Sequence, residues 1–198
     1  MFKSLIISII SINILIINLH SSELSLNLND STIDSEFIYS LNMNEDLETS
    51  FDIGGGIYYK KDNNDKNFIY KGRLGTSSRL SNMPDLKIGL GIKLLYIDED
   101  SRKSETFIVS PLFFNIDWMI PTTFVMDLGV RGGISYSPTV LSFKDASSYL
   151  DTNIETYIRV IENSEIFIGY RLIDTKYQNN NNKNYFDNNF YLGAKFLF

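Results

Sequence analysis

From residue 23 onward, hydrophobic and polar residues alternate along short segments of the chain, and turn-forming stretches separate these segments. In one of them, Leu128 and Val130 fall on one face, whereas Asp127 and Arg131 fall on the other. Alternation with a period of two is typical of a β-strand that has one apolar and one polar face. The pattern predicts ten strands, at residues 23–30, 35–43, 49–60, 66–76, 85–97, 105–117, 122–136, 150–161, 164–174 and 188–198.

Alternation by itself does not separate a soluble β-sandwich from a membrane barrel, because both contain strands of this kind. The polar face of the segments favours the barrel, since it carries many glycines together with charges of both signs. In a narrow barrel these charges would fill the lumen as a paired network. We predict that the lumen charges are Asp52, Lys71, Arg73, Lys87, Lys93, Asp127, Arg131, Glu155, Arg159, Glu165, Arg171 and Lys195.

Aromatic residues gather near both sets of predicted strand ends, as expected for two belts at the two interfaces of a bilayer. One predicted belt consists of Tyr58, Tyr59, Phe68, Tyr96, Tyr136 and Phe190, and the other of Phe114, Trp118, Phe124, Phe196 and Phe198. Together with the lumen charges, the belts favour a barrel that spans a membrane.

The predicted fold is therefore all-β: a transmembrane antiparallel up-and-down β-barrel of ten strands that occupies residues 23–198. Eight strands would remain if residues 23–43 did not join the wall. Long polar connections alternate with short ones, as outer loops alternate with periplasmic turns in such barrels. The long connections are predicted at 60–67, 97–104, 137–149 and 175–187, and the short ones at 44–48, 118–121 and 162–163. The stretch 76–84 departs from this rule, because it is long where a short turn is expected.

The first 22 residues have the order of a secretory signal peptide. Lys3 gives a positively charged start, residues 5–19 form an apolar stretch, and small residues follow at Ser21 and Ser22. The apolar stretch is too short and too polar for a spanning helix, which needs about 20 apolar residues. We therefore predict a signal peptide at residues 1–22, with a helical membrane anchor as the alternative.

The last predicted strand alternates up to the final phenylalanine of the sequence. Its pattern of Tyr191, Gly193, Phe196 and Phe198 resembles the C-terminal signature of bacterial outer-membrane barrels. In those proteins the last strand is handed to the barrel-assembly machinery, so the resemblance implies that machinery as a partner during biogenesis. It also implies a location in the outer membrane of a Gram-negative bacterium.

Several further motifs follow one another along the chain: three glycines at 54–56, Tyr-Ser-Pro at 136–138, Leu-Ser-Phe at 141–143 and Ile-Gly-Tyr-Arg at 168–171. Together with the last strand, these motifs resemble the YfaZ family of outer-membrane proteins over residues 49–198. The resemblance implies a small outer-membrane barrel. It carries no catalytic or ligand-binding residue over to this chain.

The composition leaves few groups for catalysis or metal binding. The chain has no cysteine, and its one histidine, His20, lies within the predicted signal peptide. Because acyl transfer by a serine nucleophile needs a general base poised near neutrality, we expect no enzymatic activity and no cofactor. The acidic residues at 62–65 and 98–100 lack the spacing and the glycine of an EF-hand, so we expect solvated loops and no metal there. The net charge of −6 gives no reason to expect a nucleic-acid partner.

Three functional hypotheses follow. The first is a small non-enzymatic outer-membrane barrel, either structural or a narrow pore with a charge-filled lumen. The second is a surface binding or adhesion module that acts through the extracellular loops 137–149 and 175–187. The third is a soluble periplasmic barrel or sandwich.

The expected partners of a membrane barrel are outer-membrane lipid and lipopolysaccharide. Lys60, Lys61, Arg102 and Lys103 lie near the predicted outer ends of strands, where they would contact anionic lipopolysaccharide. No oligomeric state is predicted.

Substitutions in the predicted strand 122–136 would test the wall. An arginine at Leu128, near the middle of this strand, is expected to cost about 2–4 kcal/mol of stability because it faces lipid. An alanine at Gly129, which faces inward, is expected to cost less.

Overall fold

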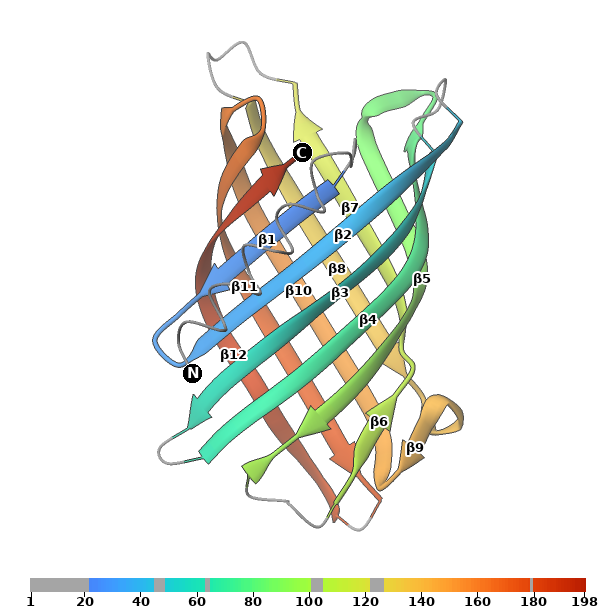
Figure 1. Cartoon of the computed structure of the whole chain (residues 1–198), viewed down its shortest axis with the longest axis vertical. Helices are drawn as coiled ribbons and strands as arrows, with labels where there is room; N and C mark the ends of the chain where they lie inside the picture. Colours follow the sequence, from blue (N-terminus) through green and yellow to red (C-terminus); the bar gives the residue numbers. More distant parts are fainter. Residues whose placement is uncertain (1–21, 45–48, 63–64, 101–104, 122–126, 179) are drawn as a thin grey trace, which may run out of the picture.

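The computed structural model shows a β-barrel whose strands tilt around a central lumen (Figure 1). It describes residues 22–44, 49–62, 65–100, 105–121, 127–178 and 180–198. The strands are β1 (Ser22–Leu28), β2 (Thr32–Asn44), β3 (Thr49–Asp62), β4 (Asp65–Leu80), β5 (Met83–Asp98), β6 (Phe107–Val109), β7 (Leu112–Ile120), β8 (Asp127–Ser137), β9 (Ser142–Lys144), β10 (Ala146–Ile161), β11 (Ser164–Tyr177) and β12 (Asn180–Leu197). A turn of 3-10 helix, η3 (Thr139–Leu141), lies between β8 and β9.

Every strand pairs antiparallel with its neighbours, and the pairing runs once around the ring. β6 and β7 follow one another along the same edge of β5, and β9 continues the position of β8 beside β6. The strands therefore occupy ten positions in a wall that closes through the β4–β5 and β1–β12 pairs. This confirms the predicted ten-strand antiparallel barrel. The eight-strand alternative is wrong, because β1 and β2 pair with neighbours on both sides.

The first and last strands meet at one end of the barrel. There the amide of Ser22 donates to the carbonyl of Phe198 at 3.2 Å, and the amide of Phe198 donates to the carbonyl of Ser22 at 2.9 Å. We call this the terminal end, and the opposite end, which carries β6 and β9 at the bottom of Figure 1, the far end. Among the described residues, no helix is long and apolar enough to cross a membrane.

The connections at the far end are shorter than predicted, because the strands continue through the segments that were expected to be loops. Most of 137–149 belongs to η3, β9 and the start of β10, and most of 175–187 belongs to β11 and β12. These two segments therefore do not form the long surface loops on which the binding-module hypothesis depends.

The stretch 76–84, which departs from the expected alternation of connection lengths, contains a tight turn. β4 ends at Leu80 and β5 begins at Met83, so two residues link them at the terminal end. The alternation of the sequence does not reveal this turn, because polar residues occupy both faces of the two strands next to it. The departure from the rule therefore disappears.

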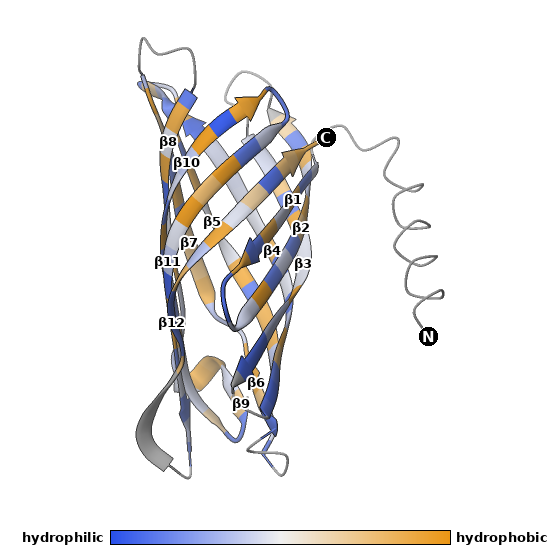
Figure 2. Cartoon of the chain, turned by 90° about the vertical axis from the view of Figure 1, so that its left-hand side faces the viewer, coloured by the Kyte–Doolittle hydropathy of each residue, from blue (hydrophilic) through white to orange (hydrophobic). Residues whose placement is uncertain are grey.

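Figure 2 shows hydrophobic and hydrophilic residues alternating along the strands, and the exposed side chains show that the outer wall is apolar, as the alternation predicts. Leucine and isoleucine side chains project outward from most strands. Exposed examples are Leu74, Leu90, Leu94, Leu112, Ile134, Ile154, Ile168 and Leu192. A surface of this kind needs an apolar solvent, since soluble monomers rarely expose a continuous apolar patch of such extent.

Aromatic rings line up on the outer wall toward the far end. Tyr59 lies 5.1 Å from Phe68, Phe68 lies 6.1 Å from Tyr70, and Tyr70 lies 6.0 Å from Tyr96, measured between ring centroids. Further rings are exposed on the same wall, namely Phe114, Trp118, Tyr136, Phe190, Phe196 and Phe198.

The belt prediction is wrong for Tyr58, whose side chain is 1% exposed and points into the lumen. Neighbouring residues of a strand face opposite sides, so Tyr58 and Tyr59 cannot both belong to an outer belt. Phe124 lies outside the described residues.

Inside the wall, aromatic rings lie directly on glycines of neighbouring strands. Tyr157 covers Gly129, Tyr191 covers Gly169, and a Cβ at either glycine would come within 2.6 Å of the ring. Phe113 covers Gly75 in the same way. Glycine leaves room for a ring to pack on the backbone, an arrangement that also pins the register of paired strands. These three inward glycines are therefore matched to inward rings.

Candidate functional site in the barrel lumen

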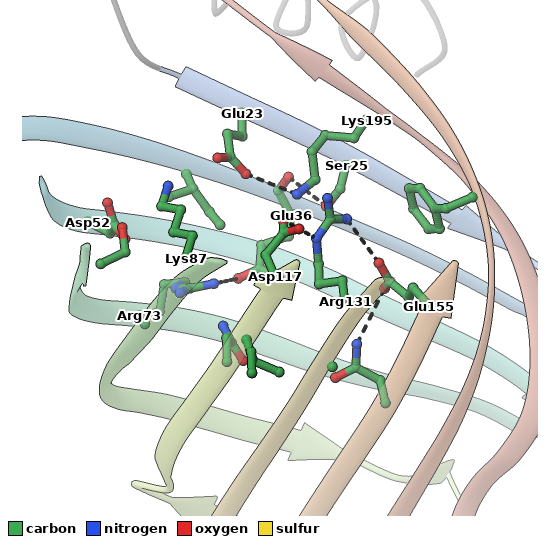
Figure 3. A pocket seen from close by; sticks show the side chains of 18 of the residues that line it. Glu23, Ser25, Glu36, Asp52, Arg73, Lys87, Asp117, Arg131, Glu155 and Lys195 are labelled. Carbon is green, nitrogen blue, oxygen red and sulfur yellow. Dashed lines mark hydrogen bonds and ion pairs between the residues drawn. The ribbon is translucent and has the colours of Figure 1, made fainter. Parts of the chain in front are cut away.

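All twelve predicted lumen charges lie on the inward face of the wall. Nine of them line one polar cavity, and the remaining three, Asp127, Arg159 and Glu165, form ion pairs beside it. The alternation of β-strands thus brings side chains from most of the wall into a single space. Figure 3 shows that these side chains converge from strands on opposite sides of the barrel.

Arg131 is the centre of the charge cluster nearest the terminal end. Its Nε, Nη1 and Nη2 atoms lie 3.0, 3.0 and 2.7 Å from carboxylate oxygens of Asp117, Glu155 and Glu165. These three carboxylates come from β7, β10 and β11, so one guanidinium ties three strands together. The fork of N–H donors in arginine suits this task better than the single ammonium of lysine.

Two tyrosines satisfy the remaining oxygens of this cluster. The hydroxyl of Tyr157 donates to Asp117 at 2.8 Å, and the hydroxyl of Tyr191 donates to Glu155 at 2.7 Å. The guanidinium carbon of Arg131 lies 4.6 Å from the ring centroid of Tyr157. Because buried charges are costly unless they are paired and hydrogen-bonded, these contacts make the cluster stable inside the barrel.

Two smaller groups of ion pairs complete the terminal end. Arg159 lies between Asp127, at 3.5 Å, and Glu165, at 3.3 Å. Lys195 of β12 pairs with Glu23 of β1 at 3.2 Å, so an ion pair reinforces the closure between the first and last strands.

A second cluster surrounds Asp34, deeper in the lumen. Asp34 of β2 accepts hydrogen bonds from Lys71 of β4 and Arg171 of β11, each at 2.5 Å. Arg73 pairs with Glu36 at 3.3 Å. None of these partners lies on a strand next to β2, so each pair spans at least one intervening strand on the inner side of the wall.

Three of the predicted charges have a different environment. Asp52 accepts hydrogen bonds from the hydroxyls of Ser40 and Ser50, at 2.7 and 2.9 Å. Lys93 donates to the hydroxyl of Ser135 at 2.9 Å. Lys87 lines the cavity, and among the described residues it forms no ion pair within 4.0 Å.

The far half of the lumen is filled by an apolar plug. Its residues are Tyr58, Ile69, Leu95, Ile97, Phe107, Val109, Ala146, Tyr149, Ile173, Tyr177 and Phe186, and none is more than 5% exposed. The rings of Phe107 and Tyr177 lie 4.8 Å apart, and those of Tyr58 and Phe186 lie 5.9 Å apart. These side chains pack against one another inside the wall.

The polar cavity lies on the terminal side of this plug and has a volume of about 160 Å³. On β4, for example, Lys71 and Arg73 line the cavity, whereas Ile69, one step nearer the far end, belongs to the plug. The cavity is smaller than the roughly 300–1,000 Å³ of drug-sized ligand sites. It has room for a small ion with a few waters. Among the described residues, no group of three or more acidic, histidine or cysteine side chains could hold a metal ion.

The sequence matches the model of one protein family, described as YfaZ precursor, over residues 1–198. The chain belongs to the YfaZ family. This YfaZ-family chain, with its closed wall and apolar exterior, is a small outer-membrane β-barrel protein. No curated protein matches it significantly.

Two solved structures are among those to which this YfaZ-family chain is similar. A bacterial polysaccharide outer membrane secretin is similar with a TM-score of 0.43 and 10% identity, over 90% of this chain and 69% of that one. OmpT of Vibrio cholerae, an outer membrane protein in its in-vitro folded trimer form, is similar with a TM-score of 0.39 and 12% identity, over 90% of this chain and 65% of that one.

Sequence reasoning missed several carboxylates of the YfaZ-family lumen. Asp34 and Glu36 hold the deep cations, Glu23 holds Lys195, and Asp117 holds Arg131. The prediction misses Asp34 because it begins the second strand at residue 35, whereas β2 begins at Thr32. A search for alternating acidic positions from residue 23 onward would have found all of these except Asp117, which closes a predicted segment.

The four residues of the predicted assembly signal lie in β12 or directly after it, and they divide between two faces. Tyr191 points inward to Glu155, and Gly193 lies under the ring of Phe167. Phe196 and Phe198 point outward and are exposed. The inward pair thus takes part in the lumen packing, while the outward pair lies on the wall.

Proposed function

We propose that this protein is a non-enzymatic barrel of the Gram-negative outer membrane whose lumen is blind. The terminal end faces the periplasm, and the far end faces outward. The apolar plug is the observation that carries the proposal, because its buried side chains form one packed cluster in the far half of the lumen. The role is structural: the protein is a rigid barrel in the membrane and not a pore.

The energetics of ion transfer support a closed barrel. An ion that entered the plug would exchange its hydration shell for rings, aliphatic side chains and a few buried polar groups such as Asp174, Thr175 and Asp187. Even effective penalties for desolvating one ion amount to several kcal/mol. The ion pairs of the lumen add a second obstacle on the terminal side, since a passing ion would compete with them.

The surroundings of the barrel follow from its surface. We propose outer-membrane lipid and lipopolysaccharide as its neighbours in the membrane, and the barrel-assembly machinery as its partner during biogenesis. Of the lysines expected to contact lipopolysaccharide, Lys61 is exposed, whereas Lys60 turns inward and donates to the carbonyl of Phe186. Arg102 and Lys103 lie outside the described residues.

Conductance of the refolded protein in planar bilayers tests the blind lumen. We expect the wild-type barrel to be silent, and the double variant Phe107→Ala with Tyr177→Ala to conduct in discrete steps, because it removes two packed rings of the plug. Heat-modifiable gel mobility confirms folding of each sample. Phe190→Ala, on the outer wall, is the matched control and should stay silent. Reproducible conductance steps from the wild-type barrel would show that the lumen is a pore.

A further inference from the structure

Two buried cations face one another directly in the deep part of the cavity. Arg73 on β4 and Lys93 on β5 are opposite each other in the strand register. Both lie against the ring of Phe113, at 4.4 and 5.6 Å from its centroid. Like charges that are directly opposite on adjacent strands destabilise a sheet. The lumen must therefore supply negative charge at this point.

The carboxylates of the protein supply that charge only in part. Arg73 pairs with Glu36 through Nη1, but its Nε is buried and has no hydrogen-bond partner. Lys93 has the hydroxyl of Ser135 as its hydrogen-bond partner, and no carboxylate oxygen of the described residues lies within 4.0 Å of its ammonium. A hydroxyl group can orient an ammonium but cannot neutralise it.

A third unpartnered donor lies in the same region. Arg171 pairs with Asp34 through Nη1, whereas its Nε is buried without a hydrogen-bond partner. The nearest carboxylate oxygen to this Nε belongs to Asp151, at 3.9 Å, which is too long for a hydrogen bond. The Oδ1 atom of Asp151 is also unpartnered.

Among the described residues, the ion pairs in this part of the cavity leave one cation without a carboxylate partner. Four cations, Lys71, Arg73, Lys93 and Arg171, line it, and Asp34, Glu36 and Asp151 pair with all of them except Lys93. Asp52 also lines the cavity, but it accepts hydrogen bonds from Ser40 and Ser50. N–H donors without hydrogen-bond partners lie on β4 and β11. Charged N–H donors bind the oxygens of phosphate, sulfate and carboxylate groups strongly.

We propose that the deep end of the lumen cavity binds a small oxyanion, such as inorganic phosphate, sulfate or the carboxylate of a small solute, between Arg73, Lys93 and Arg171. The volume of about 160 Å³ admits such an ion with a few waters and excludes larger ligands. This anion site rests on the proposed function in one respect only, which is the route by which the ion enters. A lumen that is closed at the far end admits the ion from the terminal end.

Urea unfolding of the full refolded barrel in a zwitterionic detergent tests the site. Samples in sodium phosphate, sulfate and acetate are compared with sodium chloride at matched ionic strength, and urea is used because it adds no ions. A ligand that binds only the folded state raises its stability. We expect higher urea midpoints in phosphate and sulfate than in chloride. Equal midpoints in all four salts would overturn the proposal, as would a gain in chloride alone.

Phosphate and sulfate also stabilise proteins generally, so a variant must separate the two effects. Lys93→Met removes the unneutralised ammonium, and Lys66→Met, at an exposed position on β4, is the matched control. We expect Lys93→Met to lose the gain in phosphate, Lys66→Met to keep it, and Lys93→Met to be at least as stable as the wild type in chloride. If Lys93→Met keeps the full gain, the effect is general and the site does not exist.

A direct measurement of phosphate binding tests the site even if Lys93→Met does not fold. Titration calorimetry with inorganic phosphate on the wild-type barrel should give saturable binding, weakened at least about tenfold in any folded Lys93 variant. Absence of saturable binding would overturn the site, as expected if the Lys93 amine were neutral. Conductance steps from the wild type would refute the blind lumen but leave the anion site intact, so the two failures can be told apart.

Discussion

At the scale of single residues, the side chains of the lumen fit one another in shape and charge, and the paired cations depend on particular carboxylates. Arg131 pairs with Asp117, Glu155 and Glu165, and among the described residues only Glu165 has a second cation, Arg159. Removing Arg131 would leave Asp117 and Glu155 without a counter-ion inside the barrel, and losing one partner of a buried pair costs more than the contact itself. The inward glycines depend in the same way on the rings that cover them.

Gly129→Ala tests the fit between ring and glycine. The added Cβ would lie 2.2 Å from the Tyr157 ring, so the ring must move and its hydrogen bond to Asp117 must break. We expect a loss of about 1–3 kcal/mol in the free energy of unfolding, as for other overpacked cores. Urea unfolding measures it, with Gly89→Ala as the control because a Cβ there meets nothing closer than 3.6 Å. Equal stabilities of the two variants would contradict the packing.

The alternation of the sequence predicts that Gly129 faces inward, and that placement is found. It does not reveal that the space above Gly129 is occupied, because the ring comes from a residue of another strand. For this reason the expectation that alanine at Gly129 costs less than arginine at Leu128 is revised. Which residues meet depends on the register between strands that are distant in the sequence. That register follows from the closure of the barrel and not from the local sequence pattern.

At the scale of whole elements, the height of a residue on its strand sets the cost of a charge on the outer wall. Leu128 was expected near the middle of its strand, but in the described structure it is the second residue of β8. It pairs with Ile120, the last residue of β7. It therefore lies near the terminal end, where a long charged side chain can reach the interface.

Ile154→Arg and Leu128→Arg together test the height of the wall in the membrane. Ile154 lies in the middle of β10 and is exposed on the outer wall, so arginine there should cost about 2–4 kcal/mol. Arginine at Leu128 should cost about 0–1 kcal/mol. Unfolding of both variants refolded into lipid vesicles gives the comparison. A larger loss at Leu128 than at Ile154 would mean that the membrane lies elsewhere on the barrel.

The sequence carries the number of strands and the side that each residue faces, because both depend on local alternation. The twelve predicted charges all face inward for that reason. The belt prediction is wrong for Tyr58 because it groups aromatic rings by their position along the chain and not by the face of the strand on which they lie. The plug could not be predicted in the same way. Its members, such as Ile69 and Phe107, are apolar residues that face inward. Alternation cannot distinguish them from apolar residues that face outward when the positions of the strand ends are uncertain.

At the scale of the whole molecule, the barrel has two unlike halves. The terminal half holds charges, hydroxyls and a cavity, and the far half holds packed rings and aliphatic side chains. A uniform pore would show the same lining along its axis. The division instead predicts that small polar reagents reach the lumen from one side only.

Single cysteines report this asymmetry well, because the natural chain has none. Ser77 lines the cavity near the terminal end, whereas Ala146 is 0% exposed within the plug. We expect a small charged thiol reagent to modify Ser77→Cys in the folded barrel and to modify Ala146→Cys only after urea unfolding. In intact cells, Ser77→Cys should react only after the outer membrane is permeabilised, because the proposed orientation places the terminal end in the periplasm. Thr76→Cys, on the opposite face of β4, controls for reaction through the lipid. Labelling of Ala146→Cys in the folded barrel would mean that the plug opens, and labelling of Ser77→Cys in intact cells would reverse the proposed orientation.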